Sequence, residues 1–326
     1  MAFTFVDLFC GVGGFHVALK ALDGYCVFSN DINKFSRQTY FAWHGDTPVG
    51  LDFRECMDLI PDHDVLAGGF PCQPFSLSGI GTKRTLGKPF GVEDKVSGTL
   101  FLDVMEVVRR RRPKALILEN VPSLAGHDGG KVIGEIERIL ADLGYRGANG
   151  NVNAKHWVPQ SRNRRYFVYV LKDFYSSNID ERFRKLPGTP QKVLGDILEA
   201  KWHPRYRLSD KLWQWHQQHR EKMNKRHGYK SPTNGFGYSI CRPDEVTNTL
   251  SARYGKDGSE ILVEVGDGGN PRKLTPRECA RLMGYSDELP IPVSDTQFYR
   301  QMGNSVVPPV IQWLAEPMIS CIQKGS

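Results

Sequence analysis

The feature that most constrains the fold is a strand, a glycine-rich turn and a short helix within the first 22 residues. Residues 3–8 predict a buried strand, and the apolar pattern over 17–22 predicts a helix. The glycines of the stretch 9–15 let backbone N–H groups near the helix start face a ligand. This is the first unit of a nucleotide-binding α/β fold, although His16 stands where the third glycine of a G-x-G-x-x-G pattern would be.

An acidic residue follows the next expected strand. Residues 25–29 predict that strand, and Asp31 comes about 20 residues after the first glycine, where an acid accepts hydrogen bonds from the ribose of a nucleotide. Asp31 could equally cap the helix expected over 32–42, and the two roles are compatible. Asp52, beside the third expected strand, is placed to reach an adenine amino group.

The third expected strand leads to a single thiol. Val65 to Ala67 form a short apolar run that two glycines end. Pro71 fixes the backbone just before Cys72, and Pro74 stiffens the exit. Cys72 therefore stands at the carboxyl end of a strand, the edge at which open α/β sheets bind ligands. A free cysteine is most often a small buried apolar residue, but the motifs that follow favour a nucleophile.

A long polar segment, residues 77–97, follows this thiol and is rich in glycine and lysine. It includes Lys83 and Arg84. A flexible basic loop beside a nucleophile is typical of a lid that closes over a phosphate backbone. A solvated loop without a binding role explains the same composition equally well.

A carboxylate and two arginines complete the candidate chemistry. Residues 114–118 predict a buried strand that ends at Glu119. A carboxylate there costs free energy unless it is paired or takes part in chemistry, and Cys72 at the same sheet edge favours chemistry. Arg162 and Arg164 alternate before the strand expected over 166–171, so both side chains are expected on one side.

A basic and aromatic region follows a change of composition near residues 175–190. The stretch 201–235 is rich in Trp, His, Lys and Arg, and 234–238 forms a glycine turn that holds an aromatic residue. The net charge of +7 favours a polyanionic partner. These features predict a small domain of loops and short strands suited to a groove of duplex DNA. A capping box at 275–278 then predicts a helix, and a last helix is expected over 308–322.

Cysteine usage and hydropathy argue against several other classes of protein. The seven cysteines are widely spaced, and no C-x-x-C pair occurs among them. This pattern argues against a zinc site or a disulfide framework and favours a reducing cytosol. The N-terminus lacks the basic and apolar regions of a signal peptide, and no apolar run is expected to span a bilayer.

The motifs, taken in order, resemble those of the DNA (cytosine-5)-methyltransferases. The matching segments are the glycine turn at 9–15, Gly-Phe-Pro-Cys-Gln-Pro-Phe-Ser at 69–76, Glu119-Asn120-Val121, Gln160-x-Arg162-x-Arg164 and Gly303-Asn304-Ser305. The stretch 234–307 is similar to the bacterial Dcm-type branch, whose members tend to methylate sites that begin 5′-CC. The resemblance therefore implies CCWGG, CCGG or CCNGG, without choosing among them.

The resemblance implies an α/β fold with a doubly wound, mostly parallel Rossmann-like sheet of the S-adenosylmethionine-dependent methyltransferase type, and a smaller loop-rich domain. Residues 1–189 are expected to form the catalytic and cofactor-binding domain, 190–272 the target-recognition domain, and 273–326 to complete the first. The implied partner is double-stranded DNA. A monomer in the bacterial cytoplasm, at the nucleoid, is expected, with a cognate restriction endonuclease that acts separately. Neither a metal nor a membrane is implied.

The implied catalytic residues are Cys72, Glu119, Arg162 and Arg164. Cys72 would add to C6 of a flipped-out cytosine, protonated Glu119 would hydrogen-bond N3, and the arginines would hold the base and its phosphates. The methyl donor would be S-adenosylmethionine, with S-adenosylhomocysteine as product. Its implied binding residues are Phe9, Gly11, Gly13, Gly14, Phe15, Asp31, Ile32, Asp52, Phe53, Pro71, Leu100, Asn304, Ser305 and Val306. The implied DNA contacts are Ser76, Ser78, Lys83, Arg84, Asn234, Phe236, Tyr238, Thr249, Arg253 and Tyr254.

Some positions depart from the family pattern. Ile32 stands where some relatives place an aromatic residue to stack on adenine, so that contact would be aliphatic here. Leu51 replaces an acid, with Asp52 displaced by one position. The segment 77–97 is longer than in the most compact relatives.

Three other interpretations compete with this one. A tRNA-directed cytosine-5 methyltransferase of the same fold typically lacks the separate domain expected over 190–272. A dinucleotide oxidoreductase leaves Pro71-Cys72 and Glu119-Asn120-Val121 unexplained. A DNA-binding module without turnover is disfavoured because the catalytic set is intact.

Overall fold

The chain forms two structural units in the computed structural model, which describes residues 2–70, 100–188, 192–227 and 237–324. The first unit comprises residues 1–152, 163–186 and 308–326, and the second comprises 153–162 and 187–307. The boundary after residue 186 lies close to the one expected at 189. Residues 273–307, however, group with the second unit, whereas the sequence placed them in the catalytic domain.

A six-stranded sheet in the order β2-β1-β3-β4-β6-β5 is the centre of the first unit. Strands β1, β2, β3 and β4 are parallel neighbours, and β6 runs antiparallel to β4. This agrees with the mostly parallel α/β sheet that the sequence predicts. The strands are β1 (Phe3–Leu8), β2 (Gly24–Asn30), β3 (Val65–Gly69), β4 (Ala115–Asn120), β5 (Tyr145–Asn153) and β6 (Asn163–Leu171).

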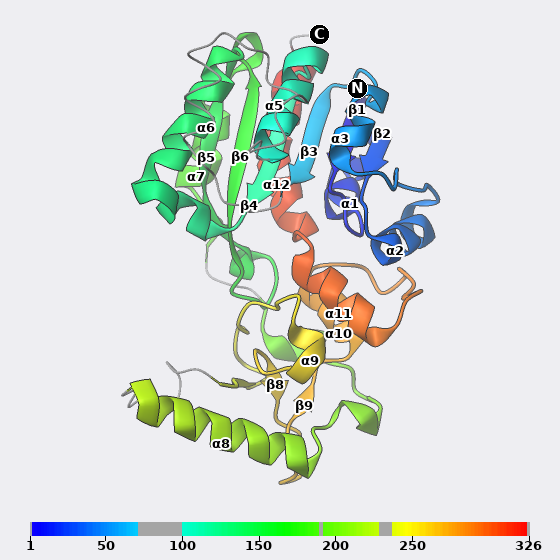
Figure 1. Cartoon of the computed structure of the whole chain (residues 1–326), viewed down its shortest axis with the longest axis vertical. Coiled ribbons are helices and arrows are strands. Elements are labelled where there is room, and N and C mark those ends of the chain that lie inside the picture. The colour runs from blue at the N-terminus through cyan, green and yellow to red at the C-terminus, as the bar shows by residue number, and fades with distance from the viewer. Residues whose placement is uncertain (1, 71–99, 189–191, 228–236, 325–326) are drawn as a thin grey trace. The chain divides into compact units, whose positions relative to one another are not determined.

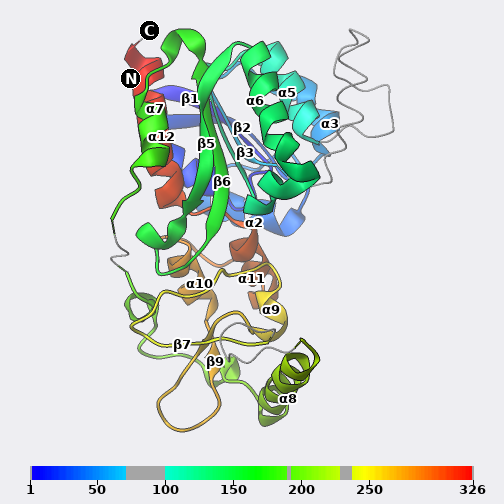
Figure 2. The ribbon, with the colours of Figure 1, turned by 90° about the vertical axis from the view of Figure 1, so that its left-hand side faces the viewer.

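Helices cover both faces of this sheet (Figure 2). The side chains of α3, α5 and α6 join Val6, Leu66 and Leu116 in one apolar cluster on one face. Helix α12 packs against α1, α7, β4 and β6 on the other. The helices of the unit are α1 (Gly14–Lys20), α2 (Lys34–His44), α3 (Phe53–Cys56), α5 (Leu100–Arg111), α6 (Lys131–Asp142), α7 (Asn178–Arg184) and α12 (Pro308–Lys324). Strands covered on both faces are apolar at nearly every position, which is why β3 and β4 were evident in the sequence.

The second unit contains a small sheet of two-residue strands in the order β7-β8-β9 and the long helix α8 (Figure 1). Its helix α10 begins with a capping box in which Thr275 accepts a hydrogen bond from the Glu278 backbone N–H, as the sequence predicts. The buried Arg272–Glu278 ion pair, at 2.7 Å, joins β9 to this helix. The elements are β7 (Ile240–Cys241), β8 (Leu262–Val263), β9 (Arg272–Lys273), α8 (Asp210–His227), α9 (Tyr254–Asp257), α10 (Pro276–Leu282) and α11 (Asp295–Asn304).

One helical stretch of the described residues, Asp295–Lys324, is long and apolar enough to cross a membrane by length and composition. It includes α12, and 67% of its most apolar window is buried inside the protein. Residues Val310, Ile311 and Leu314 of α12 are buried. Packing in the core therefore accounts for the apolar composition of α12.

Candidate active site

The turn between β1 and α1 has the left-handed backbone that its glycines allow. Gly11 and Gly13 have φ of 57° and 87°, and Phe9 has φ of 52°. A Cβ at Gly13 would lie 2.2 Å from the Nε2 atom of His44, so glycine is required there. A Cβ at Gly11 would meet no atom within 4 Å, so this side of the turn is open. Positive φ at Phe9 stores backbone strain of the kind that clusters at ligand sites.

Asp31 fastens this turn to the end of β2. Its carboxylate accepts a hydrogen bond from the Gly11 N–H at 2.9 Å and from the Asn33 N–H at 2.7 Å. Burial raises the pKa of Asp31, and the two backbone N–H donors act in the opposite direction. Asn33, not Asp31, is the N-cap of α2, because its side chain accepts from the N–H groups of Phe35 and Ser36. The helix-capping role considered for Asp31 therefore belongs to Asn33, and the ligand-binding role of Asp31 stays a prediction.

Two exposed apolar residues lie on the segments next to Asp31. Ile32, the next residue, is 67% exposed. Leu51 is also exposed, and the Asn30 side chain holds its loop by donating to the Val49 and Leu51 carbonyls, each at 3.0 Å. Exposed aliphatic residues beside an acid suit a ligand with an aromatic ring and hydroxyl groups.

The other residues expected to bind the cofactor have mixed roles. Asp52 caps α3 by accepting from the Arg54 N–H at 3.0 Å. Phe53 is buried, and its ring centroid lies 5.1 Å from that of Phe9. Leu100 begins α5 and packs against the apolar cluster, and Phe15 is buried in α1. Pro71 lies outside the described residues.

Glu119 lies at the carboxyl end of β4, directly opposite Gly69 of β3 in the sheet register. Its Oε1 atom is 3.2 Å from the Nε atom of Arg164, and both side chains are mostly buried. A Cβ at Gly69 would lie 3.3 Å from the Glu119 Oε2 atom, so a glycine here gives the carboxylate room. Two of the candidate catalytic residues, Glu119 and Arg164, therefore form an ion pair within the first unit.

Asn120 ties this acid to the segment that leads to Cys72. Its Nδ2 atom donates to the Phe70 carbonyl at 3.0 Å, and its Oδ1 atom accepts from the Val121 N–H at 2.8 Å. The side chains of Asn120 and Phe70 are both buried. The chain is thereby held beside Glu119 up to the residue before Pro71. Cys72 itself lies outside the described residues.

A second cluster, in the other unit, surrounds Arg162. Its guanidinium donates to the carbonyls of Leu250, Gly303 and Ser305 at 2.9, 2.9 and 2.7 Å. Gln160 donates to the Leu282 carbonyl and accepts from the Leu250 N–H. Arg162 and Arg164, for which the sequence predicted one shared role, thus have different contacts.

The Gly303-Asn304-Ser305 turn is packed by its backbone. A Cβ at Gly303 would lie 2.3 Å from the Ala252 nitrogen, so only glycine fits. The Ser305 hydroxyl is buried against the Tyr285 hydroxyl, and Val306 is buried. Asn304 is exposed at the end of α11, which leaves its amide available to a ligand.

Comparison with known proteins gives the family. The model of one family, described as C-5 cytosine-specific DNA methylase, matches residues 3–320. The chain belongs to this family.

The similar proteins agree with this assignment. The Type II methyltransferase M.NlaX of Neisseria lactamica is 44% identical over 329 residues, which cover 99% of this chain and 98% of that protein. The DNA-cytosine methyltransferase of Escherichia coli K12 is 38% identical, and the match covers 98% of this chain and 78% of that protein. The crystal structure of the S. pombe Dnmt2 methyltransferase has a TM-score of 0.70 at 19% identity, over 97% of this chain and 99% of that one, and shows the shared fold. The chain is therefore a DNA (cytosine-5)-methyltransferase, and it has the fold of S-adenosylmethionine-dependent methyltransferases.

The described residues of the first unit fit S-adenosylmethionine. The open side of Gly11, the Asp31 carboxylate and the exposed Ile32 offer, in turn, backbone, acceptor and apolar contacts. Each Asp31 oxygen holds one backbone N–H and keeps a further lone pair for a hydroxyl.

The residues expected to contact DNA differ in their exposure and contacts. Ser76, Ser78, Lys83, Arg84, Asn234 and Phe236 lie outside the described residues. Arg253 is exposed, whereas Thr249 is half-buried and donates to the Ser161 carbonyl at 2.6 Å. Tyr238 packs under Arg220, whose guanidinium carbon is 3.8 Å from its ring centroid. Tyr254 is fully buried, and its hydroxyl bonds the Ile261 carbonyl and the Leu274 N–H, so the DNA role expected for Tyr254 is not retained.

Sequence reasoning gave no role to Asn120, Gln160 or Asn30. Each is a buried amide that bonds backbone groups distant in sequence, at Phe70, Leu250 and Leu51 respectively. The available signal was polarity next to a motif residue, which alone does not identify a partner.

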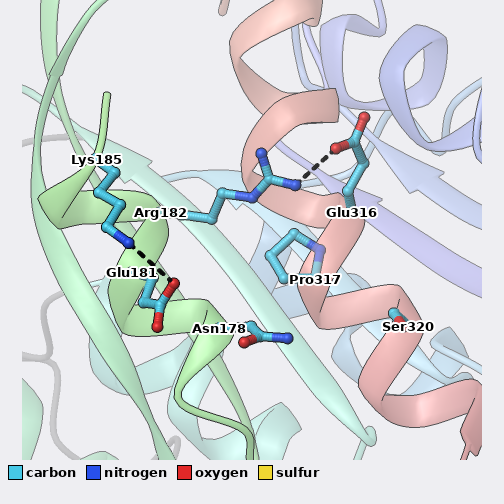
Figure 3. A pocket seen from close by; sticks show the side chains of 7 residues that line it. All are labelled: Asn178, Glu181, Arg182, Lys185, Glu316, Pro317 and Ser320. Carbon is cyan, nitrogen blue, oxygen red and sulfur yellow. Dashed lines mark hydrogen bonds and ion pairs between the residues drawn. The ribbon is translucent and has the colours of Figure 1, made fainter. Parts of the chain in front are cut away.

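A surface hollow of about 530 Å³ lies between α7 and α12 (Figure 3). Its charged side chains pair with one another: Arg182 with Glu316 at 2.8 Å, and Lys185 with Glu181 at 3.8 Å. Neither Glu119 nor Asp31 lines it. The hollow is therefore no part of the candidate active site.

Proposed function

We propose that this methylase modifies C5 of a flipped-out cytosine in duplex DNA, within a short site that begins 5′-CC. The observation that carries the proposal is the meeting of Glu119, Arg164 and the tethered Phe70 at the carboxyl edge of β3 and β4. This is the sheet edge at which α/β enzymes bind ligands. Phe70 immediately precedes the Pro71-Cys72 motif.

Each protein group in this proposal answers a need of the chemistry. C5 of cytosine is a poor nucleophile, and addition of the Cys72 thiolate to C6 makes C5 enamine-like. Glu119, in its protonated form, donates to N3 and stabilises the charge that develops there. Arg164 orients this carboxyl group through its Nε atom. After methylation, loss of the C5 proton to a base expels Cys72 and restores the ring.

The cofactor is bound, in this proposal, by the glycine turn and Asp31, with Ile32 and Phe9 against the adenine. S-adenosylmethionine, when bound, supplies the methyl group, which is electrophilic because it is attached to a positively charged sulfur. Asp31 takes the ribose hydroxyls, and the open side of Gly11 admits the chain of the cofactor close to the backbone.

The second unit reads the DNA. Its exposed Arg253 and its basic composition support this role, as does the naming of relatives as Type II methyltransferases. A 5′-CC site follows from likeness to the Dcm-type branch, which includes the E. coli DNA-cytosine methyltransferase. The Type II names also suggest a cognate endonuclease in the same bacterial cytoplasm. Arg162 is buried and donates to three carbonyls of its own unit, so the role of holding the base, expected for both arginines, is kept here for Arg164 alone.

Bisulfite sequencing tests the proposal directly. Plasmid DNA is recovered from cells that express this chain, with Cys72→Ser as the control. Protection of cytosines in one short 5′-CC motif, absent in the control, is the expected result. Protection at another motif would overturn the 5′-CC assignment. No protection of DNA, with methylation of tRNA in a parallel labelling reaction, would replace the DNA substrate with RNA.

A further inference from the structure

One face of α8 carries a row of exposed residues at helical spacing. Lys211, Trp215, Gln218, Lys222 and Arg226 follow one another at intervals of three or four residues, and all are exposed. At 3.6 residues per turn they lie within a sector of about 80°. We call these five residues the α8 stripe.

The opposite face of α8 is occupied. His216 is buried, and the ring of Trp213 lies 4.7 Å from that of Tyr238. Arg220 covers the other part of the Tyr238 ring at 3.8 Å. These contacts fix the helix on its unit, and the α8 stripe lies on the opposite face of the helix.

The stripe is cationic and carries no acid. The acidic residues of α8, Asp210 and Glu221, lie on its flank, where Asp210 accepts from Asn270 at 2.6 Å and Glu221 pairs with Lys225 at 2.8 Å. Within the described part of the chain, no ion pair engages Lys211, Lys222 or Arg226. Three cations in one row therefore face solvent together.

Trp215 gives the row an aromatic centre. It is 49% exposed, and its ring stacks on that of His219 at 4.9 Å with an interplanar angle of 9°. The stack holds the indole in place on the helix surface, where burial by a partner would gain free energy. Cations and amides around one aromatic group match a sugar–phosphate surface better than an apolar one.

We propose that the α8 stripe binds the sugar–phosphate backbone of duplex DNA without regard to sequence. This proposal rests on the DNA substrate of the proposed function. From Lys211 to Arg226 the row extends about 22 Å, at 1.5 Å per residue. That length follows about six base pairs along a DNA strand. The stripe therefore adds electrostatic affinity to the base recognition made elsewhere in the unit.

The test removes the positive charge and keeps a polar, unbranched side chain at each position. One variant combines Lys211→Gln, Lys222→Gln and Arg226→Gln. A matched control carries three Lys→Gln changes at exposed positions of the first unit, Lys20, Lys131 and Lys172, and has the same net charge. Binding of a fluorescent 30-base-pair duplex without CC or GG steps is titrated by anisotropy between 50 and 200 mM NaCl.

Counterion release sets the expected size of the effect. Loss of three phosphate contacts lowers the slope of log Kd against log salt by about 2 to 3 and weakens binding at least tenfold at 0.1 M salt. The matched control keeps the wild-type slope, and Trp215→Ala weakens binding without a change of slope. On an unmethylated duplex that contains the recognition site, the stripe variant raises KM for DNA and leaves kcat unchanged.

The proposal fails if the stripe variant keeps the wild-type slope, or if the control loses as much as the stripe variant. The same would follow if the stripe changes alter self-association or binding to anionic vesicles but not to DNA. Because anisotropy needs no turnover, a slope change in a chain that methylates no DNA would overturn the proposed function alone. A normal slope in an active chain would overturn the stripe alone.

Discussion

Removal of the Asn120 side chain tests the link between Glu119 and the Pro71-Cys72 segment. In Asn120→Ala the buried Phe70 carbonyl loses its donor and the Val121 N–H loses its acceptor. An unsatisfied buried polar group costs about 1–3 kcal/mol. If this cost is added to the activation free energy of adduct formation, the covalent adduct forms roughly 5- to 150-fold more slowly. Asn120→Asp keeps the acceptor for Val121 but places an anion against the Phe70 carbonyl, so we expect it to be slower still.

The assay is the rate at which each variant forms a stable adduct with duplex DNA that contains 5-fluorocytosine. Binding of S-adenosylhomocysteine and the melting temperature are measured beside it. Asn178→Ala, an exposed position of α7, is the matched control and is expected to leave all three unchanged. The reasoning is refuted if Asn120→Ala forms the adduct at the wild-type rate. A lower melting temperature with a normal rate in the folded fraction would make Asn120 structural only.

Three further changes test other parts of the site. Asp31→Ala removes the acceptor for the Gly11 N–H and should weaken the binding of S-adenosylhomocysteine, measured by calorimetry, at least tenfold. Asp46→Ala, at an exposed position, is the control and should bind as the wild type does. Wild-type affinity in Asp31→Ala would contradict the assignment of Asp31 to the cofactor. Gly303→Ala forces a Cβ to within 2.3 Å of the Ala252 nitrogen and should lower the free energy of unfolding in urea by about 1–3 kcal/mol. Gly134→Ala in α6 is the control, because its Cβ meets no atom within 4 Å, and it should raise the free energy of unfolding slightly. A Gly303→Ala variant as stable as the wild type would show that the turn can move. Burial lowers the pKa of His44 from 6.5 to about 4, so the stability that its neutral form confers is complete above pH 6.5 and is lost as the pH falls toward 4. His44→Gln should reduce the dependence of the melting temperature on pH between these values. A variant with the wild-type dependence would show that His44 is not the titrating group.

The sequence predicted the parts of the fold that depend on local pattern. β1 was expected over 3–8 and lies there, because apolar residues fill both faces of a central strand. The capping box of α10 was also evident, because Thr275, Pro276 and Glu278 act within one helical turn. The position of Glu119 at a sheet edge followed from the apolar run before it.

Contacts between residues far apart in sequence were not predictable in the same way. Arg162 bonds carbonyls 88 to 143 positions away, and nothing local marks those carbonyls. Helices α10 and α11 pack against each other, and α11 packs against α9, so residues 273–307 group with the second unit and the predicted return at 273 differs from the observed one at 308. Tyr254 stood in a polar stretch, but its hydroxyl satisfies two buried backbone groups instead of facing a ligand.

The division of the first unit into three stretches has a consequence for biosynthesis. Its last stretch begins at Pro308, and α12 within it packs against α1, β4 and β6. A ribosome must therefore translate the other two stretches of this unit and the whole second unit before the helix that covers one face of the sheet exists. Until then the nascent chain exposes an apolar surface that invites aggregation. We infer that chaperone binding during translation, and expression yield after truncation at residue 307, depend on this late helix more than on any residue of the active site.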